Sequence, residues 1–261
     1  MYFPVAGIEV QPWLPPVVAF TISLFTSMGG VSGAFLLLPF QVSFLGFTSP
    51  SVSATNHIFN IVAIPSGVYQ YIKEGRMVWP FTWAVIIGTL PGVLAGAVIR
   101  VKYLPDPTIF KRFVAIVLLY IGFRLLRDIL KKQTDQLAKK ESGSPQKTGV
   151  VTNTFFNSKY LGYTFERKQY QVRTLSIMML SLTVGIIGGV YGIGGGAIIA
   201  PFFISFFGLP VYTVAGAALM GTMITSFAGV VFFQAMAPFV PDMAVAPDWR
   251  LGLLFGLGGF A

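Results

Sequence analysis

Two hydrophobic runs of this chain are each interrupted by a cluster of glycines, and the two interruptions share one pattern. Aligning Gly30 with Gly192 also places Gly33 on Gly195 and the pair Pro39-Phe40 on a second Pro-Phe pair. The same alignment gives about ten identities over roughly forty positions without a gap, more than composition alone produces. The chain therefore contains an internal duplication, and its fold is expected to consist of two related halves.

The composition is that of an integral membrane protein. Hydrophobic residues make up 54% of the chain and charged residues 10%, whereas soluble domains carry about 25% charged residues. A soluble domain could not bury this much apolar surface. There is no cysteine, which excludes disulfides, thiolate metal sites and cysteine chemistry. We predict an all-α, polytopic membrane protein.

The hydrophobic runs predict where the chain crosses the membrane. A helix needs about 20 apolar residues to span a bilayer. The run 14–47 is too long for one straight span, so its glycines at 29–33 indicate either a strongly tilted helix or a re-entrant pair of half-helices. The run 175–208 is broken in the same way at 192–196. Further spans are expected at 51–71, 78–99, 109–126 and 211–237, so each repeat is a glycine-broken first segment followed by three spans.

Three regions follow from this pattern. Residues 1–130 form the first membrane repeat, and residues 131–173 form a basic cytoplasmic linker. Aromatic residues spaced among polar ones at 150–172 indicate a small surface element in this linker, such as a β-hairpin. Residues 174–261 form the second repeat. It lacks counterparts of about the last forty residues of the first repeat, so we expect the chain to be part of a longer protein.

The basic residues predict the topology. None of the 18 Lys and Arg residues lies in 1–72, whereas nine lie in 131–173, which places this linker and Lys73 in the cytoplasm. The loop of the second half equivalent to Lys73 is 238–248, which carries two aspartates and no basic residue. Opposite charge on equivalent loops favours inverted repeats. The loop 100–112 then lies on the outer side with four basic residues, which violates the positive-inside rule. Inversion requires an odd number of crossings per repeat, which re-entrant broken segments provide; parallel repeats of four full spans stay open.

The glycine clusters are the first candidate binding site. Glycine lets the backbone leave a helix and approach a ligand closely, and N–H groups freed inside a bilayer must face protein or a watery cavity. The half-helix that follows each cluster directs the positive end of its dipole at such a cavity, which favours an anion. Alternatively, the glycines only permit close helix packing. The expected binding residues at the two breaks are Gly30, Ser32, Gly33, Gly192, Gly194, Gly195 and Gly196.

A polar stripe follows each break. Asn56, His57 and Asn60 lie on one face of the span after the first break, and Thr222 and Thr225 lie on the equivalent span. Such stripes line a substrate path or hold helices together. We expect the two asparagines and the histidine to contact the substrate, with His57 as a hydrogen-bond donor or proton carrier. For the two threonines, contact with substrate and contact between helices are equal alternatives.

The acidic residues indicate the charge of the substrate. All nine Asp and Glu residues lie at or outside the predicted span ends. Cation carriers and proton pumps usually keep a carboxylate within the membrane, so an anion path is favoured. No nucleophile–base pair or metal-ligand cluster is visible. We therefore expect no catalytic residue, no metal site and no cofactor, and a secondary transporter or a passive channel for a small anion or neutral solute, not an enzyme.

The motifs around the breaks resemble the sulfite exporter TauE/SafE family, the toluene-sulfonate uptake permease group. The second copy matches its GxGGG-type cluster and following proline with 192–196 and Pro201. The run Ser53-Ala54-Thr55-Asn56 resembles the pattern that follows the first cluster, and Arg76-Met77-Val78-Trp79 resembles the start of the next span. The first copy departs from the family by having Ser32 and Ala34 where glycines are usual.

The resemblance covers nearly the whole chain outside the linker 131–173 and implies a function. The family transports sulfite, sulfonates, sulfoacetate-like anions or related oxyanions across the bacterial inner (plasma) membrane. The expected partners are a small anionic substrate, with a proton as a coupled species, and the lipid bilayer. No nucleic acid is expected, and a homo-oligomer is left open.

Overall fold

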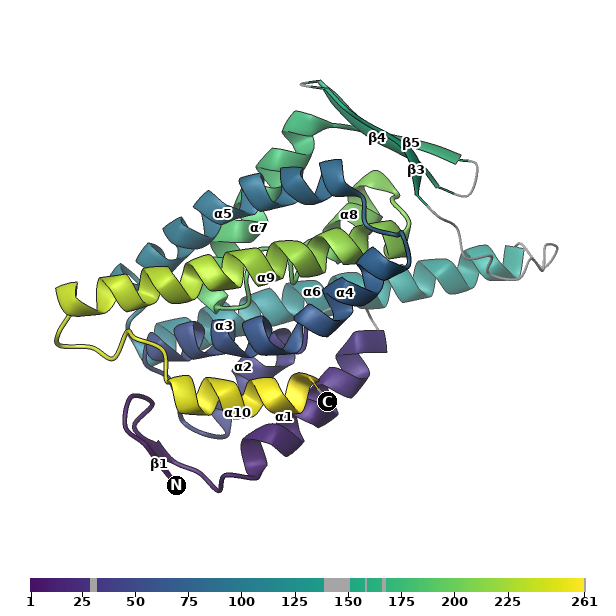
Figure 1. Cartoon of the computed structure of the whole chain (residues 1–261). Helices are drawn as coiled ribbons and strands as arrows, with labels where there is room; N and C mark the ends of the chain where they lie inside the picture. The colour runs from purple at the N-terminus through teal and green to yellow at the C-terminus, as the bar shows by residue number, and fades with distance from the viewer. Residues whose placement is uncertain (29–31, 139–150, 158, 166–167, 261) are drawn as a thin grey trace.

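The computed structural model describes residues 1–28, 32–138, 151–157, 159–165 and 168–260, and within these ranges the chain is mostly helical (Figure 1). The first half contains α1 (Leu14–Met28), α2 (Ala34–Ser43), α3 (Ser51–Ala63), α4 (Pro65–Lys73), α5 (Trp79–Lys102) and α6 (Pro107–Ala138). The second half contains α7 (Thr174–Tyr191), α8 (Ile199–Phe207), α9 (Val211–Met236), the 3₁₀ turn η1 (Ala237–Phe239) and α10 (Trp249–Phe260).

The long helices form a bundle of membrane-spanning dimensions. Among the described residues, α5, α7 and the segment Thr213–Phe239 are each long and apolar enough to cross a bilayer. Leu14–Thr26 and Ala34–Ser43 are shorter apolar helices. A short helix cannot span about 30 Å of hydrocarbon by itself. This mixture of long and short apolar helices is consistent with the predicted polytopic helical membrane protein.

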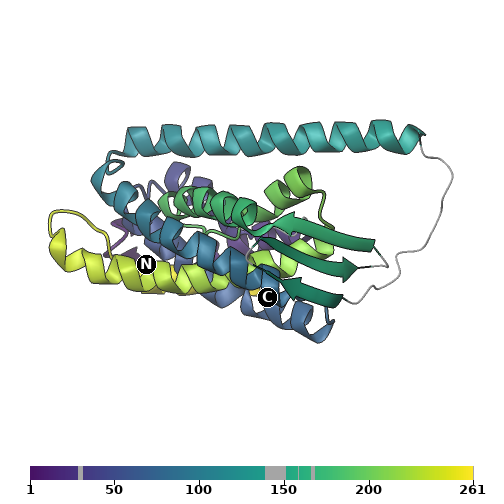
Figure 2. The same ribbon diagram turned by 90° about the horizontal axis from the view of Figure 1, so that it is seen from above.

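Most helix boundaries lie close to those predicted, and the differences have local causes. α7 ends at Tyr191 because Gly192 adopts a left-handed conformation with φ of 79°, and helix resumes only at α8. The predicted single span 51–71 is divided into α3 and α4 because Pro65 has no N–H to continue the helix. The helix that contains the predicted span 109–126 is longer than the span, since α6 continues to Ala138, and it runs along one side of the bundle (Figure 2).

Two small sheets lie outside the bundle. β1 (Tyr2–Phe3) and β2 (Ile8–Glu9) form an antiparallel pair near the N-terminus. The element expected as a hairpin in 150–172 is a three-stranded antiparallel sheet of β3 (Thr152–Phe156), β4 (Tyr160–Phe165) and β5 (Lys168–Arg173). The Tyr163 hydroxyl lies 2.7 Å from the hydroxyl of Thr213 at the start of α9, which fixes the sheet to the bundle. Burial raises the pKa of Tyr163 to about 12.

Arg100 lies at the end of α5 and is fully buried. Its guanidinium donates to the carbonyls of Leu104 and Thr48 and lies 3.7 Å from the centre of the Phe110 ring. One of the four basic residues counted in the loop 100–112 is therefore an internal structural group. The loop therefore exposes fewer positive charges than its sequence suggests. This reduces the conflict between its predicted place on the outer, non-cytoplasmic side and the positive-inside rule.

Glycines set the distance between α5 and α7. Gly88, Gly92 and Gly96 follow one another at four-residue spacing on α5, opposite Gly185 and Gly189 of α7. A Cβ atom at Gly92 would lie 2.5 Å from the Leu182 carbonyl oxygen, and one at Gly185 would lie 2.5 Å from the Thr89 carbonyl oxygen. The helix backbones are thus in direct contact, as at small-residue interfaces in membranes.

We expect Gly92→Leu to separate α5 from α7, because the new side chain meets backbone that cannot move aside. Overpacking of this kind costs about 1–3 kcal/mol or more. The variant should lose its monodisperse peak in detergent size-exclusion chromatography at a temperature where the unaltered chain keeps it. Gly122→Leu is the matched control, since nothing lies within 4 Å of a Cβ atom there. Equal behaviour of the two variants would contradict the role of Gly92.

Candidate functional site

Asn60 of α3 connects the segments that carry the two glycine clusters. Its side-chain oxygen accepts a hydrogen bond of 2.6 Å from the Ser32 hydroxyl, just before α2. Its amide nitrogen donates to the Ile193 carbonyl at 3.0 Å and to the Ser226 hydroxyl of α9 at 3.2 Å. Asn60, Ser32 and Ser226 are all buried. The Asn60 side chain therefore bonds both its own half of the chain and a residue 133 positions further along.

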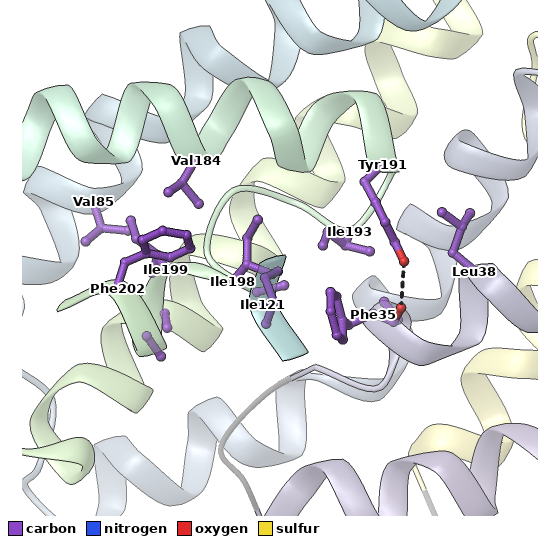
Figure 3. Packing of buried hydrophobic residues seen from close by; sticks show 14 of the residues in the cluster. Phe35, Leu38, Val85, Ile121, Val184, Tyr191, Ile193, Ile198, Ile199 and Phe202 are labelled. Carbon is purple, nitrogen blue, oxygen red and sulfur yellow. Dashed lines mark hydrogen bonds between the residues drawn. The ribbon is translucent and has the colours of Figure 1, made fainter. Parts of the chain in front are cut away.

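Further buried bonds join the same segments. The Asn56 amide donates to the Ala34 carbonyl at 3.1 Å and accepts a bond of 3.2 Å from Gln41 of α2. At the end of α7, the Tyr191 hydroxyl donates to the Phe35 carbonyl at 3.1 Å, and the two rings stack (Figure 3). The start of α2 is thus tied both to α3 and to the end of α7.

His57 belongs to α3, and its side chain contacts α9. Its Nδ1 atom is 3.2 Å from the Ser226 hydroxyl, and its Nε2 atom has no hydrogen-bond partner among the described residues. The ring packs against Gly229, where a Cβ atom would lie 2.7 Å from Nε2. The side chain is fully buried. His57 is therefore a buried group with one free ring nitrogen, joined to Asn60 through Ser226.

The second break is closely packed. Gly192 and Gly194 have left-handed φ angles of 79° and 74°, which only glycine adopts readily. The Gly195 N–H donates to the Thr225 hydroxyl at 3.1 Å, and a Cβ atom at Gly196 would lie 2.6 Å from the Thr222 backbone nitrogen. In this conformation the packing interpretation accounts for these glycines, and their role in binding stays a prediction.

A cavity of about 360 Å³ adjoins the first break. Its polar side is formed by Ser23 and Thr26 of α1 together with Ser32 and Gly33. The Ser23 hydroxyl is buried and has no partner among the described residues. The remaining lining is largely apolar, including Phe59 and Leu219, and no charged residue is among the described lining residues. The cavity thus combines a hydroxyl-rich end with an apolar body.

The structure brings only part of the predicted site together. Gly30 lies outside the described residues. Ser32 and Gly33 line the cavity, and Asn60 reaches it through Ser32. Asn56 and His57 belong to the surrounding hydrogen-bond network. Thr222 and Thr225 donate to carbonyls of their own helix at 2.8 and 2.7 Å, and Thr225 also accepts from the second break.

Other residues of this region were not among those predicted from the sequence as binding residues. They are Ser23, Thr26, Gln41, Tyr191 and Ser226. The sequence signal for Ser226 was its place one residue after Thr225 on the polar stripe. Ser23 and Thr26 lie one helical turn apart just before the first glycine cluster, and this spacing could have marked them. Tyr191 gives no such signal, because an aromatic residue in an apolar run is usually a packing residue.

The comparison with known families agrees with the resemblance. The sequence model of the family described as sulfite exporter TauE/SafE matches residues 16–261, nearly the whole chain. The chain belongs to the sulfite exporter TauE/SafE family. No curated protein and no solved structure matched the chain. TauE/SafE membership together with the apolar helices identifies an integral membrane protein, and the cavity beside Ser32 is the candidate site of this TauE/SafE chain.

Replacing Asn60 with Leu keeps the branched shape of the side chain and removes every hydrogen bond that this side chain makes. The Ser32 hydroxyl and the Ile193 carbonyl then lose a partner inside the protein, which costs about 1–3 kcal/mol for each buried group. We expect a clear fall in the melting temperature of the detergent-solubilised protein. Thr183→Val is the control, since Thr183 is exposed and bonds only its own helix. An unchanged melting temperature for Asn60→Leu would show that the network is not stabilising.

Proposed function

We propose that this chain is a secondary transporter of small sulfur oxyanions or organosulfonates, such as sulfite and sulfoacetate-like anions, across the inner membrane, and not an enzyme. The observation that carries this proposal is the network of Asn60, which bonds both glycine-containing segments directly beside a cavity. Family membership supports the substrate class. We place the anion near the middle of the membrane, at the end of the cavity beside Ser32, where the Asn60 network joins the first break to the second.

The chemistry of the cavity suits such an anion. An oxyanion that leaves water needs hydrogen-bond donors in place of its hydration shell. The Ser23 hydroxyl supplies a donor at one end and needs no internal bond to be broken first. The neighbouring hydroxyls of Thr26 and Ser32 donate to the Ile22 carbonyl and to Asn60, so they can donate to the anion only after those bonds are exchanged. The apolar walls accommodate the carbon body of an organosulfonate. Because no described lining residue is charged, the anion is bound by neutral donors and can be released.

The position of the cavity supports an alternating-access cycle. Tyr71, near the end of α4, is among its lining residues, and Lys73 and the basic linker predict cytoplasm at that end. We assign this arrangement to the inward-facing state of two inverted repeats. In the opposite state the second break separates from α9. Thr225, which now accepts the Gly195 N–H, then releases that donor to the anion.

Ser23→Ala tests the binding role without disturbing the fold. Removing a buried hydroxyl that has no internal partner should not lower stability. A lost hydrogen bond to a charged ligand is worth about 1.5–3 kcal/mol, so we expect the KM for sulfite or sulfonate to rise at least tenfold. The measurement is the uptake of labelled anion by proteoliposomes that contain the folded variant or the unaltered protein.

Thr21→Ala is the matched control, since the Thr21 hydroxyl is exposed and bonds the carbonyl of Val17 in its own helix. Counterflow of labelled anion driven by unlabelled anion separates a transporter from a passive channel, which shows neither counterflow nor saturation. Absence of saturable flux with a full panel of sulfonates would contradict the proposed function. An unchanged KM for Ser23→Ala would contradict the site.

His57→Gln tests proton coupling. His57 is the only histidine of the chain, and its buried Nε2 atom, without a partner among the described residues, is free to accept a proton when the site opens to water. Glutamine keeps a hydrogen bond to Ser226 but does not titrate in this range. We expect the variant to retain counterflow and to lose the acceleration that a proton gradient gives to net flux. Equal acceleration in the variant and the unaltered chain would exclude His57 as the proton carrier.

A further inference from the structure

The three-stranded sheet is attached directly to a membrane span. Strand β5 ends at Arg173 and α7 begins at Thr174, with no residue between them. The Thr174 backbone N–H donates to the Lys159 carbonyl at 3.1 Å, and its hydroxyl donates to the Asn157 carbonyl at 3.0 Å. The turn between β3 and β4 is therefore held at the first residue of the span. This places that end of the sheet at the level of the lipid headgroups.

Basic and aromatic side chains gather at this end of the sheet. Tyr160 is paired with Arg173 across the strands, and Lys159 precedes Tyr160 in the turn. Both basic residues are exposed, and Phe156 and Tyr160 are 59% and 38% exposed. The described residues of the sheet contain no Asp or Glu. Neither Lys159 nor Arg173 has an ion-pair partner within the described part of the chain.

The face of α7 below this cluster is also exposed. Leu175 and Met179 lie four residues apart, on one side of the helix, and are 70% and 59% exposed. In a bilayer this side meets acyl chains. A lipid whose chains lie along Leu175 and Met179 brings its headgroup to the level of Lys159 and Arg173. Aromatic residues at this depth are typical of membrane–water interfaces.

We propose that Lys159 and Arg173, flanked by Phe156 and Tyr160, bind the phosphate of an anionic phospholipid of the cytoplasmic leaflet. Two exposed positive charges with no carboxylate nearby among the described residues are complementary to such a headgroup, and arginine can bind a phosphate through two parallel hydrogen bonds. The site orients the sheet on the membrane. Through the bond between Tyr163 and Thr213, the bound lipid also supports the start of α9, the helix that contacts the second glycine break.

The test is lipid retention by the full chain in detergent, measured by native mass spectrometry with equal amounts of phosphatidylglycerol and phosphatidylcholine. We expect the unaltered protein to retain phosphatidylglycerol preferentially. In the double variant Lys159→Gln/Arg173→Gln the ratio of retained phosphatidylglycerol to phosphatidylcholine should fall roughly tenfold. Each basic residue near an anionic surface raises the affinity for anionic lipid several-fold. Its melting temperature without lipid should be unchanged, because both side chains are exposed.

The matched control is Lys102→Gln/Lys111→Gln, which removes two exposed charges near the opposite end of α5 and should leave the preference intact. Equal preference in the sheet variant and the unaltered chain would overturn the proposal. Displacement of phosphatidylglycerol by millimolar inorganic phosphate would also overturn it, since the site would then bind a soluble anion. Retention of both lipids at equal levels by the unaltered protein would overturn it as well.

Discussion

Backbone that leaves helical structure inside a membrane must find hydrogen-bond partners within the protein, and the rest of this structure depends on how that is done. The side chains of α3 and α9 provide the partners. Asn60 donates to the Ile193 carbonyl, Asn56 donates to the Ala34 carbonyl, and Thr225 accepts the Gly195 N–H. The polar stripes that follow the glycine clusters thus hold the breaks themselves. A substrate path at the same place would use groups that the fold already needs.

The two breaks differ in what surrounds them. The glycines of the second break lie against α9 and α5, where Gly195 faces Thr89 and Gly196 faces Thr222. The first break has Ser32 where the second break has Gly194, and a cavity lies beside it. The serine hydroxyl connects this cavity to Asn60 and so to the second break. In the proposed transport cycle the two glycine-containing segments take different conformations in turn, and we assign the difference between them to one side of that cycle.

Much of the helical organisation could be predicted from hydrophobicity, because membrane spans need long apolar runs: α5, α7 and α9 lie close to the predicted ranges. Local chemistry also predicted the polar faces of α3 and α9. The division at Pro65 and the extension of α6 to Ala138 were missed, since apolar run length marks neither a bend nor a helix that leaves the membrane. The contact between Asn60 and Ile193 depends on how distant helices pack, which periodicity along one helix does not encode. The cavity and the free hydroxyl of Ser23 arise from where packing is incomplete, so no motif signals them.

In the proposed function the anion occupies the hydroxyl-rich end of the cavity, beside Ser32 and the Asn60 network. Selenite has the geometry of sulfite and a strong anomalous X-ray signal, so crystals of the chain equilibrated with selenite test the claim directly. We expect an anomalous peak within hydrogen-bonding distance of the Ser23 and Ser32 hydroxyls, and we expect competing sulfite to abolish it. An anomalous peak elsewhere in the protein that sulfite abolishes, with the cavity unoccupied at saturating selenite, would contradict binding at this site.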